Sequence, residues 1–223
     1  APYCSDCNSE YHVDYFESAC PTCGKELSSR SAKMSKSLGN TVSPEEMISR
    51  FGADTVRLFI LFGANPEAGM DWSDSALEAN HRQINSLFDA IDEAMALSDA
   101  PSKIDGWLLS RMRANQNKWI EVMSDVSLRE GVMISHFEML SDWNWYLRRG
   151  GQDRTTAMKF LEGWIPMLAP ATPHIAEEFW NMFGGKDLLA ALEIPILSIE
   201  PDDLHNLAVE EYVKNIISLS LIH

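Results

Sequence analysis

The sequence predicts a mainly α-helical protein, in which a helical bundle follows a small cysteine-rich hairpin. All four cysteines lie within the first 23 residues, and apolar residues recur at three- and four-residue intervals from about residue 43 onward. The chain has 223 residues and is 45% hydrophobic, which is ordinary for a folded protein and too high for a disordered one. No apolar run approaches the roughly 20 residues that a membrane-spanning helix needs, so we exclude a membrane protein.

The cysteines form two Cys-x-x-Cys pairs, Cys4/Cys7 and Cys20/Cys23. This spacing is typical of a zinc ribbon, in which each pair forms a tight turn that directs two thiolates at one ion. Two disulfides or four unrelated thiols are the alternatives, although nothing in the sequence signals secretion. Four thiolates leave no open position for a substrate. We therefore predict a structural zinc site with these four ligands, and His12, which lies between the pairs, outside the ligand set.

Two short helices are expected next. Ser43-Pro44-Glu45-Glu46 is a capping box with Pro at the first helical position, and it predicts a helix that runs to Phe51. Gly52 ends this helix, and a second, mostly apolar helix is expected over residues 53–62. Pro66 and Gly69 lie in a stretch, residues 63–72, that we expect to be a loop.

Long amphipathic helices are expected to make up the bundle. Ser75 is predicted to start the first of them, and Thr172 to cap the last. A short helix near residues 188–192, an extended piece at 194–199 and a helix from about Ala208 are expected to follow. Helices of this length joined by short breaks predict an antiparallel bundle. The expected bundle helices begin near residues 75, 104, 127, 153 and 173.

Aromatic residues, methionines and histidines offer no clear ligand cage. The seven tryptophans and eleven methionines lie at helical spacing, so we expect them in the core. His81 and His136 are expected to face solvent or to make hydrogen bonds, and His174 is expected to be a structural hydrogen-bonding residue.

The charge of the chain is strongly negative, with 33 acidic residues against 18 Lys and Arg for a formal net charge of −15. This balance argues against a generic nucleic-acid binder. Residues 28–43, however, contain no acid, while Arg30, Lys33 and Lys36 lie among several serines. Gly39 and Asn40 tolerate a left-handed backbone, so this segment can approach a polyanion closely. A phosphate-binding loop is therefore one hypothesis, beside an ordinary basic surface loop.

Four segments resemble motifs of a known family. The sequence Lys-Met-Ser-Lys-Ser-Leu-Gly-Asn at residues 33–40 is similar to KMSKS, the second signature of class I aminoacyl-tRNA synthetases. Phe-Gly-Ala-Asp-Thr-Val-Arg-Leu-Phe at 51–59 and Met-Asp-Trp-Ser-Asp-Ser at 70–75 look like the leucyl-tRNA synthetases. Pro-His-Ile-Ala-Glu-Glu at 173–178 resembles an element in the helical domain of this subgroup. The isoleucyl, valyl or methionyl enzymes remain alternatives, as does a non-catalytic zinc-ribbon and helical module that binds RNA or a protein.

The resemblance implies a fragment from the C-terminal side of the catalytic unit of a leucine–tRNA ligase, with a helical bundle of the anticodon-binding type. The chain has no counterpart of the His-rich first signature of this class, so we expect the isolated fragment to be inactive. Its implied parts are a zinc-ribbon insertion (1–32), the lysine loop with connecting helices (33–72), the anticodon-binding bundle (73–186) and a tail leading to a missing C-terminal region (187–223). The ribbon directly precedes the lysine loop, and this adjacency suggests that it helps to position the loop.

The resemblance also implies a reaction. The enzyme activates leucine with ATP and Mg to form leucyl-adenylate and transfers it to tRNA(Leu). The loop would close over the ATP phosphates, with Lys36 as the principal transition-state ligand and Lys33 assisting. This in-line displacement needs positively charged groups beside the leaving pyrophosphate, and it needs no covalent nucleophile. The implied phosphate-binding residues are Lys33, Met34, Ser35, Lys36 and Ser37.

Further partners follow from the same resemblance. It implies a cytoplasmic location and the remaining catalytic and editing domains of the same chain. For tRNA contact we single out Trp145, Arg148, Arg149 and Arg154, because aromatic and basic residues interleave at a predicted helix end. A core aromatic stripe with solvated arginines is the alternative interpretation.

Overall fold

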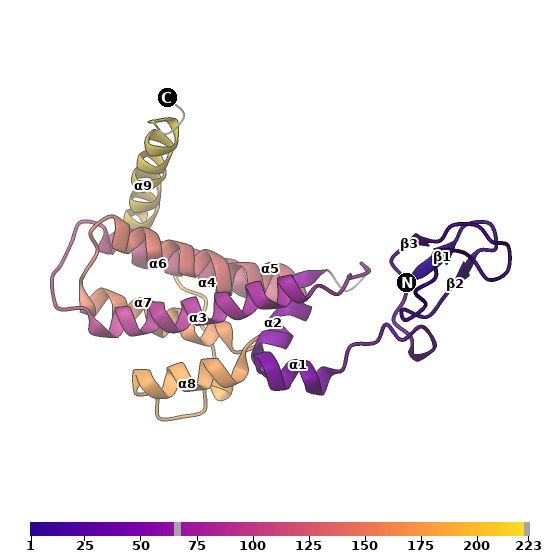
Figure 1. Cartoon of the computed structure of the whole chain (residues 1–223). Helices are drawn as coiled ribbons and strands as arrows, with labels where there is room; N and C mark the ends of the chain where they lie inside the picture. The colour runs from indigo at the N-terminus through magenta and orange to yellow at the C-terminus, as the bar shows by residue number, and fades with distance from the viewer. Residues whose placement is uncertain (65–67, 221–223) are drawn as a thin grey trace. The chain divides into compact units, whose positions relative to one another are not determined.

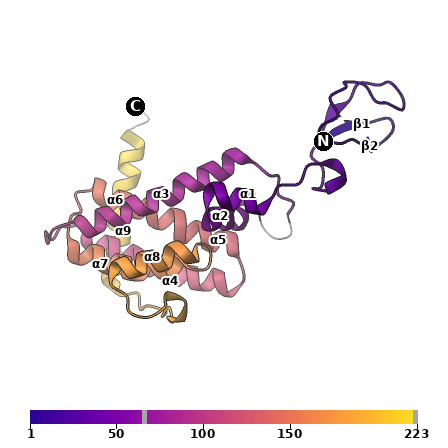
Figure 2. The ribbon, with the colours of Figure 1, turned by 60° about the horizontal axis from the view of Figure 1, so that its bottom comes forward.

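The computed structural model describes residues 1–64 and 68–220, and the chain divides into two compact units, one of residues 1–50 and one from residue 51 onward. Figures 1 and 2 show the elements of both, which are described separately. The prediction of a mainly α protein with a small N-terminal hairpin is confirmed. Among the described residues, no helix combines the length and apolarity needed to cross a bilayer.

The N-terminal unit is built on a small antiparallel sheet of order β2-β1-β3, in which Tyr3 of the central strand lies opposite Glu10 and Ser28. Its buried side chains are Cys4, Cys20 and Met47. With so little apolar surface buried, the unit depends on polar contacts and on its cysteines. Its elements are β1 (Pro2–Cys4), β2 (Ser9–Glu10), β3 (Ser28–Ser29), the 3-10 turn η1 (Lys36–Leu38) and α1 (Pro44–Phe51).

The predicted Ser43 cap at the start of α1 is confirmed, while the Glu46 carboxylate lies near Arg50, at 3.9 Å. The Ser43 hydroxyl accepts a hydrogen bond from the Glu46 amide at 3.4 Å, and it donates to the Glu45 carboxylate at 2.9 Å. One of the free amides of the first turn is thereby satisfied.

The second unit is the helical bundle. Helix α4 packs against α5, α6, α7 and α9, while α7 also packs against α3 and α8. In Figure 1 the long helices α3, α4, α6 and α7 run lengthwise beside one another, and α9, in yellow, leaves them at a steep angle. Its elements are α2 (Ala53–Gly63), α3 (Asp74–Ala96), α4 (Asp105–Ser124), α5 (Leu128–Val132), the π turn η2 (Met133–Glu138), α6 (Met139–Arg148), α7 (Arg154–Leu168), α8 (Pro173–Phe183), the 3-10 turn η3 (Leu189–Ala191) and α9 (Pro201–Ser220).

Aromatic side chains fill much of the bundle core. Trp143 stacks on Phe160 with ring centroids 5.9 Å apart, and Phe160 contacts Trp164 at 5.3 Å. All three side chains are fully buried. Trp107 and Trp119 are also buried, which agrees with the expectation that most tryptophans belong to the core.

Several predicted boundaries were wrong. Helix α3 begins one residue before Ser75, because the Ser73 hydroxyl accepts the Ala76 amide at 3.3 Å and caps it. Helix α8 has its predicted first residue, Pro173, and Thr172 stands at the N-cap position. The Thr172 hydroxyl makes no capping hydrogen bond, however, since it is bonded to His136 and to the Leu168 carbonyl.

Further differences lie around the termini of other helices. Helix α9 begins at Pro201 rather than near Ala208, because the Asp203 carboxylate accepts the Glu200 amide at 3.0 Å and closes the first turn. The helix expected from 127 is interrupted by η2, and the short helix near 188–192 is a 3-10 turn. The expected loop at 63–72 includes residues 65–67, which lie outside the described residues.

Candidate functional site

The four cysteines converge on one point. Their Sγ atoms all lie within 4.8 Å of one another, with Cys4 to Cys23 at 3.5 Å and Cys7 to Cys20 at 3.9 Å. Four sulfurs placed tetrahedrally about zinc at about 2.3 Å stand roughly 3.8 Å apart, so the observed spacing fits that ion. All four thiols are free, which excludes the two-disulfide alternative. His12 is not a member of the cluster.

Two residues in the left-handed region shape the turns around the cluster. Asn8 follows the first pair with a φ of 50°, and Gly24 follows the second with a φ of 72°. Both are residue types that adopt this conformation readily. An ion pair between Lys25 and Asp6, at 2.7 Å, joins the two turns from outside.

The thiols differ in acidity. The Tyr11 hydroxyl lies 3.1 Å from Cys20 Sγ, and this hydrogen bond lowers the pKa of the Cys20 thiol to about 6. Hydrogen bonds from the neighbouring thiols, first of all Cys23, together with burial raise the pKa of Cys7 to about 12. Because a metal binds thiolates, uptake of an ion by this cluster has to release protons.

The lysine loop, which we define as residues 33–40, is closed by its own polar side chains. Ser35 Oγ accepts the Leu38 amide at 3.3 Å at one end of η1, and the Gly39 amide donates to the Lys36 carbonyl at 3.2 Å at the other. Asn40 closes the mouth of the loop, since its Oδ1 accepts the Ser35 amide at 2.7 Å. Gly39 has a φ of 68°, which is the left-handed conformation that we predicted this residue to tolerate.

The basic residues of the acid-free segment 28–43, which contains the lysine loop, fall into two kinds. Arg30 is engaged, because its guanidinium pairs with Glu10 at 2.9 Å and lies over the Tyr3 ring. Lys33 and Lys36 are exposed, and within the described residues neither forms an ion pair. Met34 and Ser37 are exposed as well, so the loop offers ammonium and hydroxyl groups to solvent.

The four predicted tRNA-contact residues lie at and beyond the end of α6. Trp145 Nε1 and Arg149 Nε both donate to Glu210 of α9, at 2.8 and 2.7 Å, and the Glu210 carboxylate is buried. Arg154 donates from its backbone to Ser98 at 2.9 Å and from its side chain to the Met95 carbonyl. Arg148 is exposed, and its guanidinium lies 5.6 Å from the centre of the Trp145 ring.

Two of the motifs quoted for the resemblance meet in the bundle, which the sequence alone did not reveal. Arg57 of α2 donates to the carbonyls of Ala171 at 3.0 Å and Pro170 at 2.8 Å. Asp54, one turn earlier, accepts hydrogen bonds from residues at the start of α8. A signal was available for Asp54, because an acid on the buried face of an apolar helix needs a partner, whereas Arg57 is exposed.

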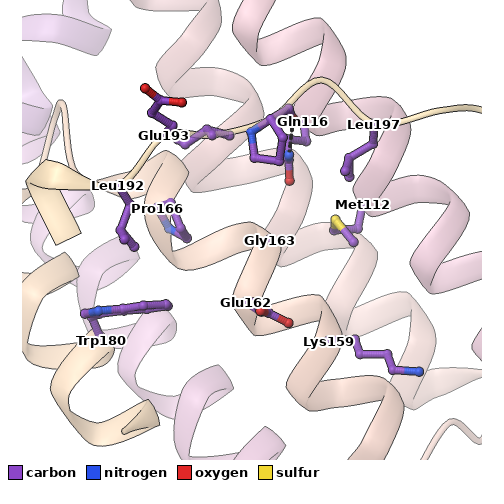
Figure 3. A pocket seen from close by; sticks show the side chains of 12 residues that line it. Met112, Gln116, Lys159, Glu162, Gly163, Pro166, Trp180, Leu192, Glu193 and Leu197 are labelled. Carbon is purple, nitrogen blue, oxygen red and sulfur yellow. Dashed lines mark hydrogen bonds between the residues drawn. The ribbon is translucent and has the colours of Figure 1, made fainter. Parts of the chain in front are cut away.

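A cavity of about 400 Å³ lies within the bundle unit, between α4, α7, α8 and the segment after η3 (Figure 3). Met112, Gly163 and Pro166 line it, with Trp180 and Glu193 at its margins. Gln116 Nε2 donates to the Pro195 carbonyl at 2.7 Å and holds the covering segment in place. None of the predicted site residues lines this cavity.

The comparisons with known proteins agree with this architecture. Residues 105–220, just over half of the chain, match the family model of the anticodon-binding domain of tRNA ligase. Residues 24–73, which include the lysine loop, match the model of the class I tRNA synthetases for I, L, M and V. The chain therefore belongs to the class I tRNA ligase family, of the type that carries this anticodon-binding domain.

Within that family its relatives are leucine–tRNA ligases. The chain is 31% identical over 189 residues to the leucine–tRNA ligase of Methanosarcina mazei, which covers 82% of this chain and 19% of the relative. It is 33% identical over 190 residues to that of Thioalkalivibrio sulfidiphilus, covering 82% and 23%. These matches favour the leucyl interpretation over the isoleucyl, valyl and methionyl alternatives. The chain spans about a fifth of the length of these relatives.

A solved structure shows the same fold. The crystal structure of the LeuRS–tRNA–LeuAMS ternary complex of Agrobacterium radiobacter K84 aligns with a TM-score of 0.62 and 25% sequence identity. The alignment covers 75% of this chain and 23% of the LeuRS chain.

Proposed function

We propose that this chain supplies the phosphate-binding lysine loop and a tRNA-binding helical domain to a leucine–tRNA ligase, which forms leucyl-adenylate from leucine and ATP with Mg and transfers it to tRNA(Leu). The observation that carries the proposal is the pair of exposed lysines, Lys33 and Lys36, which form no ion pair with any described residue and lie on a loop without any acid. A cytoplasmic location and further catalytic and editing domains belong to the same proposal.

The chemistry assigned to the loop is electrostatic. Adenylate formation builds negative charge on the pyrophosphate that leaves, and an ammonium about 4 Å from a phosphate oxygen contributes roughly 4 kcal/mol at an effective dielectric near 20. Lys36, in η1, is the principal ligand in this proposal, and Lys33 assists. Met34, Ser35 and Ser37 complete the phosphate-facing segment, with the serine hydroxyls as donors.

Zinc is the ion proposed for the cysteine cluster. The sulfur spacing, the set of four thiols and the acidic Cys20 suit a four-coordinate structural site. Such an ion would supply folding energy to the N-terminal unit, and with four protein ligands it would have no position left for a substrate.

The tRNA contact is proposed for the end of α6. Arg148 has its charge available, and Trp145 offers a partly exposed ring beside it. Arg149 and Arg154 add positive charge nearby while they also hold other parts of the bundle. The matched family of the anticodon-binding domain supports this assignment.

The test is leucine-dependent ATP–pyrophosphate exchange in the full-length ligase. We expect Lys36→Ala to slow exchange by about a thousandfold, as a loss of roughly 4 kcal/mol requires, and to leave tRNA binding nearly intact. Lys103→Ala, which removes an exposed lysine of the bundle unit, is the control and should have no effect. An unchanged exchange rate in Lys36→Ala would overturn the assignment.

The amino acid is tested in the same assay. Leucine should support exchange, while isoleucine, valine and methionine should not do so at comparable concentration. Preference for one of these three would contradict the proposed substrate and leave the lysine loop in its proposed role.

A further inference from the structure

A three-residue segment of the N-terminal unit touches both the cysteine cluster and the lysine loop. Tyr11 points to the cluster, where its hydroxyl meets Cys20 Sγ at 3.1 Å, and its amide donates to the Pro2 carbonyl at 2.9 Å. His12 and Val13, the next two residues, contact the loop instead. We call residues 11–13 the bridging segment.

The contact of His12 is made with Gly39. A Cβ atom built on Gly39 would lie 2.2 Å from His12 Nε2 and 2.4 Å from Cε1, so the imidazole packs directly on the glycine backbone. The ring is held in place from behind, because the Asp14 amide donates to His12 Nδ1 at 3.2 Å. Gly39 thus needs the absence of a side chain for two reasons: its positive φ and the ring that lies on it.

The contact of Val13 is a backbone hydrogen bond. Its amide donates to the Leu38 carbonyl at 2.9 Å. Leu38 and Gly39 are the two residues that close η1 behind Lys36. The bridging segment therefore holds the C-terminal end of the turn from which the Lys36 side chain projects.

On its other side the bridging segment is held through Tyr11, which contacts Cys20, donates to the Pro2 carbonyl and stacks on Tyr15 with ring centroids 5.4 Å apart. The N-terminal unit buries only Cys4, Cys20 and Met47 among its described residues, so no apolar core fixes residues 11–13. An ion held by the four thiolates would fix Cys20, and through Tyr11 it would fix the segment.

We propose that His12 is a positioning residue for Lys36, and that metal loading of the cysteine cluster orders the lysine loop through the bridging segment. The inference rests on the proposed function of the loop for its catalytic consequence, although the coupling itself is a property of this chain. Lys36 would meet the phosphates, while His12 acts only through Gly39.

The first test is amide hydrogen exchange of residues 35–39 in the chain with and without zinc. Removal of zinc should speed exchange at Leu38 and Gly39, and equal exchange in the two states would overturn the coupling to the metal. The variants are compared in the zinc-loaded chain. We expect His12→Ala to speed exchange at Leu38 and Gly39 by about tenfold, because local opening costs less, while one equivalent of zinc stays bound. His12→Phe keeps a flat ring on Gly39 and should stay within about twofold of the unchanged chain. Val13→Ala, which keeps the amide and shortens an exposed side chain, is the control. Unchanged exchange in His12→Ala, or faster exchange throughout residues 1–50, would overturn the inference.

A double-mutant comparison isolates the contact. Gly39→Ala adds a methyl group against the ring and strains a positive φ, and His12→Ala should relieve the first effect only. The two changes together should therefore speed exchange less than the product of their separate effects. Gly52 has a φ of 84° and open space around it, so Gly52→Ala combined with His12→Ala should be multiplicative. Multiplicative behaviour of the Gly39 pair would contradict the contact.

The catalytic consequence is tested in the full-length ligase. His12→Ala should lower kcat for pyrophosphate exchange by about tenfold with the KM for leucine unchanged, and His12→Phe should restore it. Amide exchange decides the positioning role, whereas the effect of Lys36→Ala on pyrophosphate exchange decides the proposed function. If Lys36→Ala slows pyrophosphate exchange but His12→Ala leaves amide exchange in the lysine loop unchanged, this inference is contradicted and the proposed function is not.

Discussion

The Asp54 carboxylate accepts a hydrogen bond from His174 Nδ1 at 2.8 Å, although the two residues are 120 positions apart in the sequence. Its other oxygen accepts the Ile175 amide, also at 2.8 Å. The carboxylate is 4% exposed and lies at the N-terminal end of α8, where the free amides and the helix dipole favour a negative charge. Helix α2 thereby caps a helix that begins 120 residues later, and the prediction that His174 makes a structural hydrogen bond is confirmed.

Removing this carboxylate should weaken the bundle. We expect Asp54→Ala to lower the free energy of unfolding by about 2 kcal/mol, because the partly buried Ile175 amide loses its acceptor and α8 loses its capping charge. Urea denaturation of the chain measures the change. Asp89→Ala, at an exposed position of α3, should stay within about 0.5 kcal/mol of the original chain. Equal stability of the two variants would show that the contact contributes nothing.

Stability should fall in acid because of His136. Its side chain is fully buried between Ser135 and Thr172, and burial lowers its pKa to about 3. The unfolded chain, with an ordinary histidine pKa near 6.5, binds the proton more readily, so the contribution is complete above that value and is lost as the pH falls toward 3.

We expect this histidine to make the bundle about 1.4 kcal/mol less stable at pH 5.5 than at pH 7.5. His136→Gln cannot titrate, and in urea denaturation at both pH values it should lack this part of the pH dependence. A difference between the two pH values that is the same in both proteins would contradict the assignment.

Loss of a cysteine should affect one unit only. Cys20→Ser is expected to weaken zinc binding by at least about a hundredfold and to unfold residues 1–50, since four thiolates supply the binding energy. Competition with a chromogenic chelator measures the affinity, and the far-ultraviolet dichroism of the bundle should hardly change. Ser5→Ala, inside the first turn, should bind zinc normally. Normal zinc binding by Cys20→Ser would exclude the proposed site.

The arginines at the end of α6 should separate into two kinds. Arg148→Ala should reduce the slope of log K for tRNA binding against log salt by about 1 without a change in stability, as expected for one lost phosphate contact. Arg149→Ala should instead lower the free energy of unfolding by about 1 to 2 kcal/mol, because the buried Glu210 loses a charged partner that is itself partly exposed. Filter binding and urea denaturation distinguish them, and an unchanged salt slope in Arg148→Ala would remove it from the interface.

Much of this architecture was predictable from local sequence. The Cys-x-x-Cys spacing predicted the cluster of four sulfurs, because each turn of that length directs its two thiolates at one ion. The Ser43 cap and the glycines after α1 and α8, Gly52 and Gly184, fixed boundaries for the same reason, since neighbours in the chain satisfy these groups.

What failed depended on contacts between distant parts of the chain. Thr172 has the sequence of a cap, but its hydroxyl is used by His136, which is 36 residues earlier. The hydrogen bonds of Trp145 and Arg149 to the buried Glu210 were not predicted, because Glu210 lies on a helix whose start was misplaced. The bridging contact of His12 with Gly39 has no periodic pattern at all, because it follows from the backbone path of two loops.

The π turn at Met133–Glu138 determines where the helix can lose one residue without rotating its buried face. A π turn accommodates one residue more than an α turn, so the helices on either side keep the phase they would have without that residue. Elsewhere in a helix, a one-residue deletion rotates everything beyond it by about 100° and turns buried faces outward. At this turn the deletion would convert the segment to regular α-helix and leave Trp143 and Tyr146 facing the core. Single-residue gaps in this family are therefore expected to gather at 133–138.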